Sequence, residues 1–207
     1  MEPIVLWRRP AKRGPRTPLV VLLHGRGADE HDLIDLSNVL PKAFGYASVR
    51  GFVEMPEGGY TWFENRGPAR PIAASVRNSV ARLRTWLDTP GVTVPGVPLY
   101  LLGFSAGMMM AGALVLDDPA RFSGAVLLSG ALAFDAGIPT GAGRLDGLPV
   151  FHGHGTLDEM IPRELAIRTS AYLEKESGAE LSSRRYPIAH SISHREIGDI
   201  AAWLEAR

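Results

Sequence analysis

The chain of 207 residues contains no cysteine. This absence excludes disulfide bonds, metal sites built from thiolates and a cysteine nucleophile. Any covalent catalysis by the protein must therefore use another atom. The hydrophobic fraction of 45% is nevertheless large enough for a well-buried core. Because the length falls within the range of one domain, we expect a single domain over residues 1–207.

An excess of charge and a long apolar run are also missing. The 22 basic and 22 acidic side chains cancel, which disfavours a nucleic-acid groove or a polybasic membrane anchor. No apolar run approaches the roughly 20 residues that span a bilayer, and the first residues lack the pattern of a signal peptide. We therefore expect a cytoplasmic protein with no nucleic-acid partner, no membrane span and a small-molecule substrate. The sequence leaves a homodimer open.

One basic cluster stands near the N-terminus. It consists of Arg8, Arg9, Lys12, Arg13 and Arg16. Prolines interrupt this cluster, so we interpret it as a solvated loop and assign it no function.

Apolar runs alternate with helical stripes along the rest of the chain. Runs without polar alternation predict buried strands, and these cover residues 19–23, 97–102, 125–128 and 149–151. Amphipathic stripes predict helices around residues 33–40, 72–87, 106–117, 165–173 and 193–204. This order predicts an α/β fold, with a mostly parallel central sheet, helices on both faces and no separate lid domain. Ligand sites in such folds lie beyond the carboxyl ends of the strands.

The sequence Gly103-Phe104-Ser105-Ala106-Gly107 occupies such a position, between a predicted strand and a predicted helix. In that context G-x-S-x-G indicates a nucleophile elbow, a tight turn that projects the serine hydroxyl outward. The alternative is a glycine-rich turn in which Ser105 only caps the helix. We favour Ser105 as a nucleophile because two other segments supply its partners.

The first partner segment is His154-Gly155-Thr156-Leu157-Asp158, which follows the predicted strand at residues 149–151. Its position predicts that the Asp158 carboxylate lies at the same edge of the sheet as Ser105, where it could orient a base. Glu159 is an alternative carboxylate, and Asp158 could instead cap the next helix. We prefer Asp158 because its shorter side chain holds a neighbour more firmly.

The second partner is a histidine in YPIAHSISHRE, after a predicted strand at residues 181–186. His190 lies in a loop at the strand end, where no helix fixes it away from the serine. His194 falls at the first position of the final helix, which Ser193 and Glu196 open with capping-box spacing. His154 is another competitor, or a loop histidine that braces the turn holding Asp158. Chain order and loop position favour His190 as the base.

A fourth segment, His24-Gly25-Arg26-Gly27, directly follows the predicted strand at residues 19–23. Its glycines would let backbone N–H groups point at a developing oxyanion. We predict that the N–H groups of Arg26 and Ala106 form this oxyanion hole. The alternative is a turn that only ends the strand.

These motifs together resemble the carboxylesterase and phospholipase family of α/β-hydrolases, which includes acyl-protein thioesterases. The resemblance rests on LLHGRGADEHDL, GFSAGMMMAGALVLDDPARFSGAVLLSG, HGTLDEMIP and YPIAHSISHREIGDIAAWL. It implies an α/β-hydrolase fold and the same Ser105, Asp158 and His190 triad. It also implies that an aromatic pair, Trp62 and Phe63, lies near the acyl pocket.

These features predict a serine hydrolase that cleaves carboxylic esters or thioesters of short to medium acyl chains through an acyl-enzyme. We expect an apolar substrate wall made of Trp62, Phe63, Leu132, Met160 and Ile161. The chemistry requires no metal and no organic cofactor. A peptidase or amidase of the same fold and a non-catalytic binding module are the alternatives.

Overall fold

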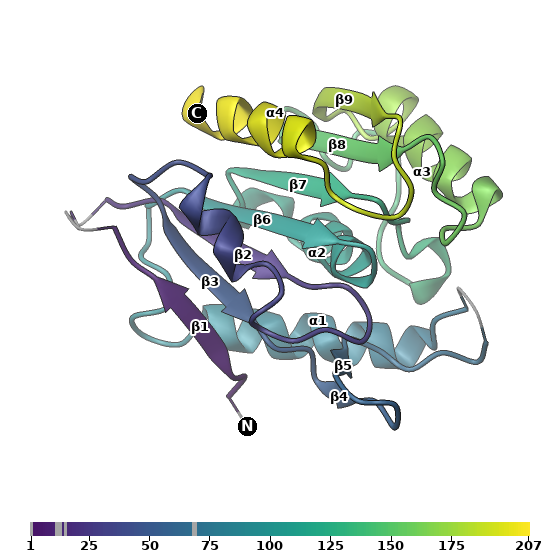
Figure 1. Ribbon diagram of the computed structural model, residues 1–207, viewed down its shortest axis with the longest axis horizontal. Coiled ribbons are helices and arrows are strands. Elements are labelled where there is room, and N and C mark those ends of the chain that lie inside the picture. The colour runs from purple at the N-terminus through teal and green to yellow at the C-terminus, as the bar shows by residue number, and fades with distance from the viewer. Residues whose placement is uncertain (1, 11–13, 15, 68–69) are drawn as a thin grey trace.

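The computed structural model describes residues 2–10, 14, 16–67 and 70–207. Its centre is a seven-stranded sheet in the order β1-β3-β2-β6-β7-β8-β9 (Figure 1). The sheet strands are β1 (Val5–Arg8), β2 (Leu19–Leu23), β3 (Gly45–Val49), β6 (Leu99–Phe104), β7 (Gly124–Leu128), β8 (Pro149–Gly155) and β9 (Glu180–Tyr186). Only the edge strand β1 runs antiparallel to its neighbour, so the sheet is mostly parallel, as predicted.

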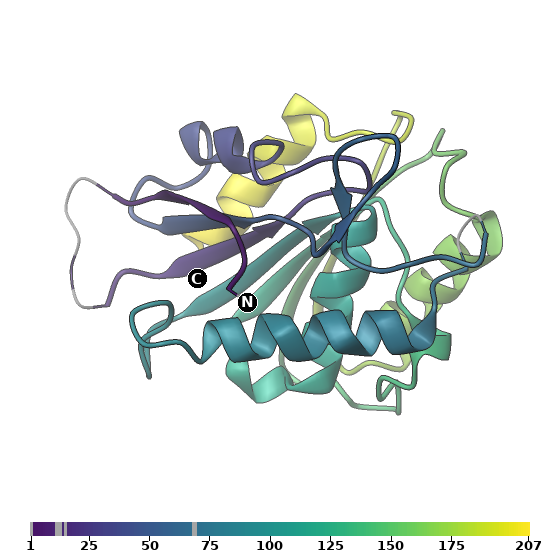
Figure 2. The ribbon, with the colours of Figure 1, turned by 90° about the horizontal axis from the view of Figure 1, so that it is seen from below.

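Helices cover both faces of this sheet (Figure 2). The α-helices are α1 (Ala73–Leu87), α2 (Ala106–Asp117), α3 (Arg163–Lys175) and α4 (His194–Glu205), and the 3-10 helices are η1 (Ile34–Asn38), η2 (Pro119–Arg121) and η3 (Phe134–Ala136). The core under α1, α2 and α3 contains Leu83, Leu114 and Leu173. The core under η1 and α4 contains Ile34 and Ile200. The predicted two-faced α/β arrangement is confirmed, and within the described residues no helix is long and apolar enough to cross a bilayer.

The predicted buried strands are present with small shifts at their ends. The run at residues 19–23 matches β2, and the runs in the middle of the chain become β6, β7 and β8. The segment between β3 and α1 contains a short hairpin of β4 (Val53–Glu54) and β5 (Tyr60–Thr61). The hairpin forms because Gly58 and Gly59 both adopt a positive φ, which permits the tight turn.

The predicted α-helix at residues 33–40 is wrong. The structure has the 3-10 helix η1 there, and Leu33, Ile34 and Leu40 are still buried. Pro41 disfavours helical backbone at the residue before it, so too few residues remain for a stable α-helical segment. The apolar stripe therefore identified the buried side chains but not the type of helix.

The basic N-terminal cluster is described only in part, because Lys12 and Arg13 lie outside the described residues. Arg8 ends β1, and the Arg9 guanidinium stacks over the Trp7 ring at 5.3 Å from the ring centre.

Helix α4 begins at the predicted cap. The Ser193 hydroxyl accepts a hydrogen bond from the backbone N–H of Glu196 at 3.1 Å. The Glu196 side chain does not complete the capping box, because it turns into the core against Gly153 and is fully buried. Neither of its oxygens has a hydrogen-bond partner in the described part of the chain. Burial is the main cause that raises the pKa of Glu196 to about 7, and the nearby Asp199 carboxylate adds to it.

This carboxyl predicts a stability that falls as the pH rises. An acid whose pKa is higher in the folded state than in the unfolded chain costs stability once it ionises, so the cost develops between about pH 4.5 and pH 7. The wild type should lose stability over this range and Glu196→Gln should not. We therefore expect the free energy of unfolding of the variant, relative to that of the wild type, to rise by about 2 to 3 kcal/mol from pH 5 to pH 8. Urea unfolding at both pH values measures this difference. Glu205→Gln, on the exposed end of the same helix, is the control, and equal pH dependence in the two variants would contradict the assignment.

Candidate active site

Ser105 lies in the sharp turn between β6 and α2, at the carboxyl edge of the sheet. Its φ is 56° and its ψ −117°, a backbone conformation that serine rarely adopts. Glycine is required on both sides of this turn: a Cβ on Gly103 would overlap the Gly107 carbonyl, and a Cβ on Gly107 would overlap the Leu23 carbonyl at the end of β2. The G-x-S-x-G spacing therefore follows from a close crossing of backbones.

The structure brings the three residues predicted as a triad into one hydrogen-bonded chain. The Ser105 hydroxyl and His190 Nε2 lie 2.9 Å apart, and His190 Nδ1 lies 2.8 Å from Asp158 Oδ2. If the ring proton is on Nδ1, it is donated to Asp158, and Nε2 is left to accept from the serine hydroxyl. The His190 ring packs against Phe104 at a centroid distance of 4.9 Å. His190 is 85 residues from Ser105 in sequence and 32 residues from Asp158.

Asp158 is held by the turn that carries it. Its side chain has no exposed surface, and Oδ1 accepts hydrogen bonds from the backbone N–H groups of Met160 at 2.9 Å and Ile161 at 3.2 Å. Oδ2 is left to face His190. Glu159 and His194, weighed as alternatives from the sequence, are both exposed.

The turn after β2 lies beside the serine. A Cβ on Gly25 would be 3.5 Å from the Ser105 Cβ. Ala106 is the first residue of α2, and the first N–H groups of a helix have no partner inside the helix. No acceptor in the described residues lies within hydrogen-bond distance of the Arg26 N–H. Both N–H groups predicted as oxyanion donors therefore lack a hydrogen-bond partner in the described residues, one directly after Ser105 and one directly after Gly25.

Sequence reasoning did not identify how this turn is fixed. His24 is fully buried, with Nδ1 2.7 Å from the Gly25 carbonyl and Nε2 2.9 Å from the Gly51 N–H. Burial lowers the pKa of His24, which agrees with a neutral ring that donates at Nδ1 and accepts at Nε2. The only signal in the sequence was a histidine at a strand end, which does not reveal its partners.

Three of the expected substrate-wall residues lie in the core. Trp62 is 0% exposed, Phe63 4% and Leu132 2%. Trp62 has no surface through which an acyl chain could contact it, and its Nε1 donates a hydrogen bond to the His24 carbonyl at 2.8 Å. Its ring also packs against the His24 ring in a tilted arrangement, with the ring centroids 5.2 Å apart. Met160, in contrast, is 71% exposed.

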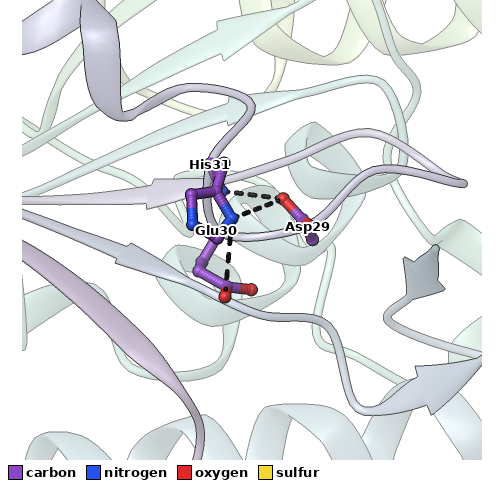
Figure 3. Close-up of side chains that lie close together, drawn as sticks. All are labelled: Asp29, Glu30 and His31. Carbon is purple, nitrogen blue, oxygen red and sulfur yellow. Dashed lines mark hydrogen bonds and ion pairs between the residues drawn. The ribbon is translucent and has the colours of Figure 1, made fainter.

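A second polar cluster follows the same turn (Figure 3). The side chains of Asp29, Glu30 and His31 each place one potential metal ligand within 4.8 Å of the others. Protein donors already occupy these oxygens: Arg50 binds both oxygens of Glu30, and His31 donates its backbone N–H to Asp29. The hydrogen bond with Arg50 is the main cause that lowers the pKa of Glu30. We interpret the cluster as an ion-pair network that ties this loop to the end of β3.

Comparison with known proteins agrees with the geometry. Residues 10–207 match the family described as Phospholipase/Carboxylesterase. The carboxylesterase SOBER1 of Arabidopsis thaliana is 26% identical over 71% of this chain and 77% of its own length. The putative hydrolase MhqD of Bacillus subtilis is 25% identical over 94% of this chain and 96% of its own length.

Solved structures of similar fold include a carboxylesterase from Bacillus cereus. Its TM-score is 0.85 at 21% identity, over 99% of this chain and 94% of that chain. At this identity the likeness concerns the fold alone, and it supports the α/β-hydrolase arrangement described above.

The contact between Trp62 and His24 generates a stability prediction. We expect Trp62→Phe to lower the free energy of unfolding by about 2 to 4 kcal/mol, because it leaves a cavity and an unpaired buried carbonyl. Trp7→Phe is the matched control, since Trp7 is only half-buried and its indole donates no hydrogen bond to a described residue. Urea unfolding measures both variants. Equal losses in the two would show that the Trp62 hydrogen bond contributes nothing.

Proposed function

The chain belongs to the phospholipase/carboxylesterase family of hydrolases, and we propose that it hydrolyses carboxylic esters, and also thioesters, through an acyl-enzyme at Ser105. The observation that carries this proposal is the hydrogen-bonded chain from Ser105 through His190 to Asp158, at 2.9 and 2.8 Å. The strained turn that exposes the serine hydroxyl at a sheet edge supports the same role.

The proposed first half-reaction transfers the acyl group to Ser105. His190 Nε2 accepts the hydroxyl proton as the serine oxygen attacks the substrate carbonyl, and Asp158 stabilises the resulting imidazolium. The tetrahedral intermediate then expels the alkoxide or thiolate, which takes the proton from His190. Water attacks the acyl-enzyme in the second half-reaction, again with His190 as base, which releases the acid and restores the serine.

Backbone donors are proposed to stabilise the negative oxygen of both tetrahedral intermediates. Ala106 follows Ser105 directly and Arg26 follows Gly25, whose Cβ would lie 3.5 Å from the Ser105 Cβ, and neither N–H has a partner in the described residues. One such donor is typically worth about 3 to 4 kcal/mol of transition-state stabilisation.

Short to medium acyl chains are the proposed substrates. The exposed apolar side chains next to Asp158 are Leu157 at 63% and Met160 at 71%. Exposed apolar side chains of this kind discriminate chain length weakly, because buried apolar area supplies only about 25 cal/mol per Å².

Ser105→Ala tests the proposal. We expect kcat/KM for p-nitrophenyl butyrate to fall by at least about 10⁴-fold, because the variant has no nucleophile. The melting temperature should stay within a few degrees of the wild type, since Ala has nearly the same size. A fluorophosphonate probe should label the wild type once, at Ser105, and should not label the variant.

Ser129→Ala is a matched control for labelling. Ser129 also follows a strand of the sheet with a positive φ, of 42°, but its side chain is fully buried. This variant should keep full labelling. Retained turnover in Ser105→Ala would refute the proposal. Hydrolysis of p-nitroanilides at rates that match the esters would indicate an amidase instead.

A further inference from the structure

The carboxylate of Asp158 has more donors around it than His190 alone. A carboxylate offers about four lone-pair positions. The N–H groups of Met160 and Ile161 fill the positions on Oδ1, and His190 Nδ1 fills one on Oδ2. The remaining position on Oδ2 faces Nε2 of His154, at 3.5 Å. Asp158 therefore lies between two imidazole rings.

The surroundings of His154 determine where its proton sits. The residue lies near the end of β8, and its side chain is 5% exposed. Nδ1 is buried without a hydrogen-bond partner among the described residues. A proton on Nδ1 would be stranded, whereas a proton on Nε2 points at a carboxylate. The neutral ring is therefore best placed with its N–H toward Asp158.

Burial, aided by nearby cations, favours the neutral form of His154. Burial is the main cause that lowers the pKa of His154, and Arg185 and His190 lower it further, while only Asp158 raises it. The neighbouring ring, His152, is also buried, and burial lowers its pKa to about 3. A second imidazolium beside Asp158 would compete with His190 for its negative charge. A neutral His154 can donate without that competition.

We propose that His154 is a positioning residue of the active site, whose Nε2–H fixes the Asp158 carboxylate so that Oδ2 stays aligned with His190. The inference rests on the proposed function, since it assigns a role within the same triad. At 3.5 Å the contact is longer than a hydrogen bond, and the proposed role requires it to shorten as charge develops on His190.

The test compares two replacements of His154 in two backgrounds. His154→Phe keeps an aromatic ring but has no donor, and His154→Gln retains an amide N–H. We expect His154→Phe to lower both kcat for p-nitrophenyl butyrate and the rate of fluorophosphonate labelling about tenfold, with KM within about twofold, and His154→Gln to recover most of the loss. In an Asp158→Asn background, where the carboxylate is gone, His154→Phe should change the rate of fluorophosphonate labelling by less than about twofold.

The result also separates positioning from packing. An equal loss in both backgrounds, or a His154→Gln variant as slow as His154→Phe, would mean that the ring only fills space, and would overturn the proposal. If His154→Phe does not fold, His154→Leu replaces it in the same comparison, and full activity of either variant equally refutes it. Ser105→Ala in the same assay reports on the hydrolase mechanism itself. If Ser105→Ala loses activity while the His154 variants keep the wild-type activity, only the role of His154 is refuted.

Discussion

The backbone crossing of Gly107 with the end of β2 is the contact on which the site depends. Because no side chain fits between Gly107 and the Leu23 carbonyl, the first turn of α2 can lie directly against the strand end. This contact brings Ala106 and the turn at Gly25 to the two sides of Ser105. A larger residue at position 107 would separate the serine from the proposed oxyanion donors, even if every hydroxyl and imidazole were retained.

The charge of the candidate site is carried by one buried carboxylate, that of Asp158. The Asp158 side chain has no exposed surface, and its hydrogen-bond partners are two backbone N–H groups and the His190 ring, with His154 Nε2 3.5 Å away. Burial keeps His24 and His154 neutral. An unpaired buried charge is costly, so a single carboxylate with several donors makes a rigid support for His190. The neutral His24 ring supplies hydrogen bonds to the turn, and a neutral His154 adds no charge that would compete for Asp158.

The sequence predicted most of the sheet because buried parallel strands are continuous apolar runs, as at residues 19–23. It did not reveal β3, whose residues include Gly45, Ala47 and Ser48. These residues have little preference for extended structure, and the strand is held by its pairing with β1 and β2. Ser105, Asp158 and His190 were identifiable because each follows a strand in a parallel sheet. The side-chain contacts that support the site were not identifiable, because contacts such as that of Trp62 with His24 depend on the packing of distant segments.

The burial of Trp62 and Leu132 moves the expected substrate surface to a different element. The exposed apolar side chains beside Asp158, Leu157 and Met160, belong to the turn whose backbone holds that carboxylate. Side chain and backbone at position 160 therefore have separate tasks in the proposed mechanism: the exposed thioether would contact an acyl chain, while the N–H holds Oδ1 of Asp158. A replacement that keeps the N–H would alter substrate contact alone, whereas proline, which has no N–H, would also release Oδ1 of Asp158. Under the proposed function, side chains at this turn could therefore be exchanged to change acyl preference while the contacts that align Asp158 with His190 are kept.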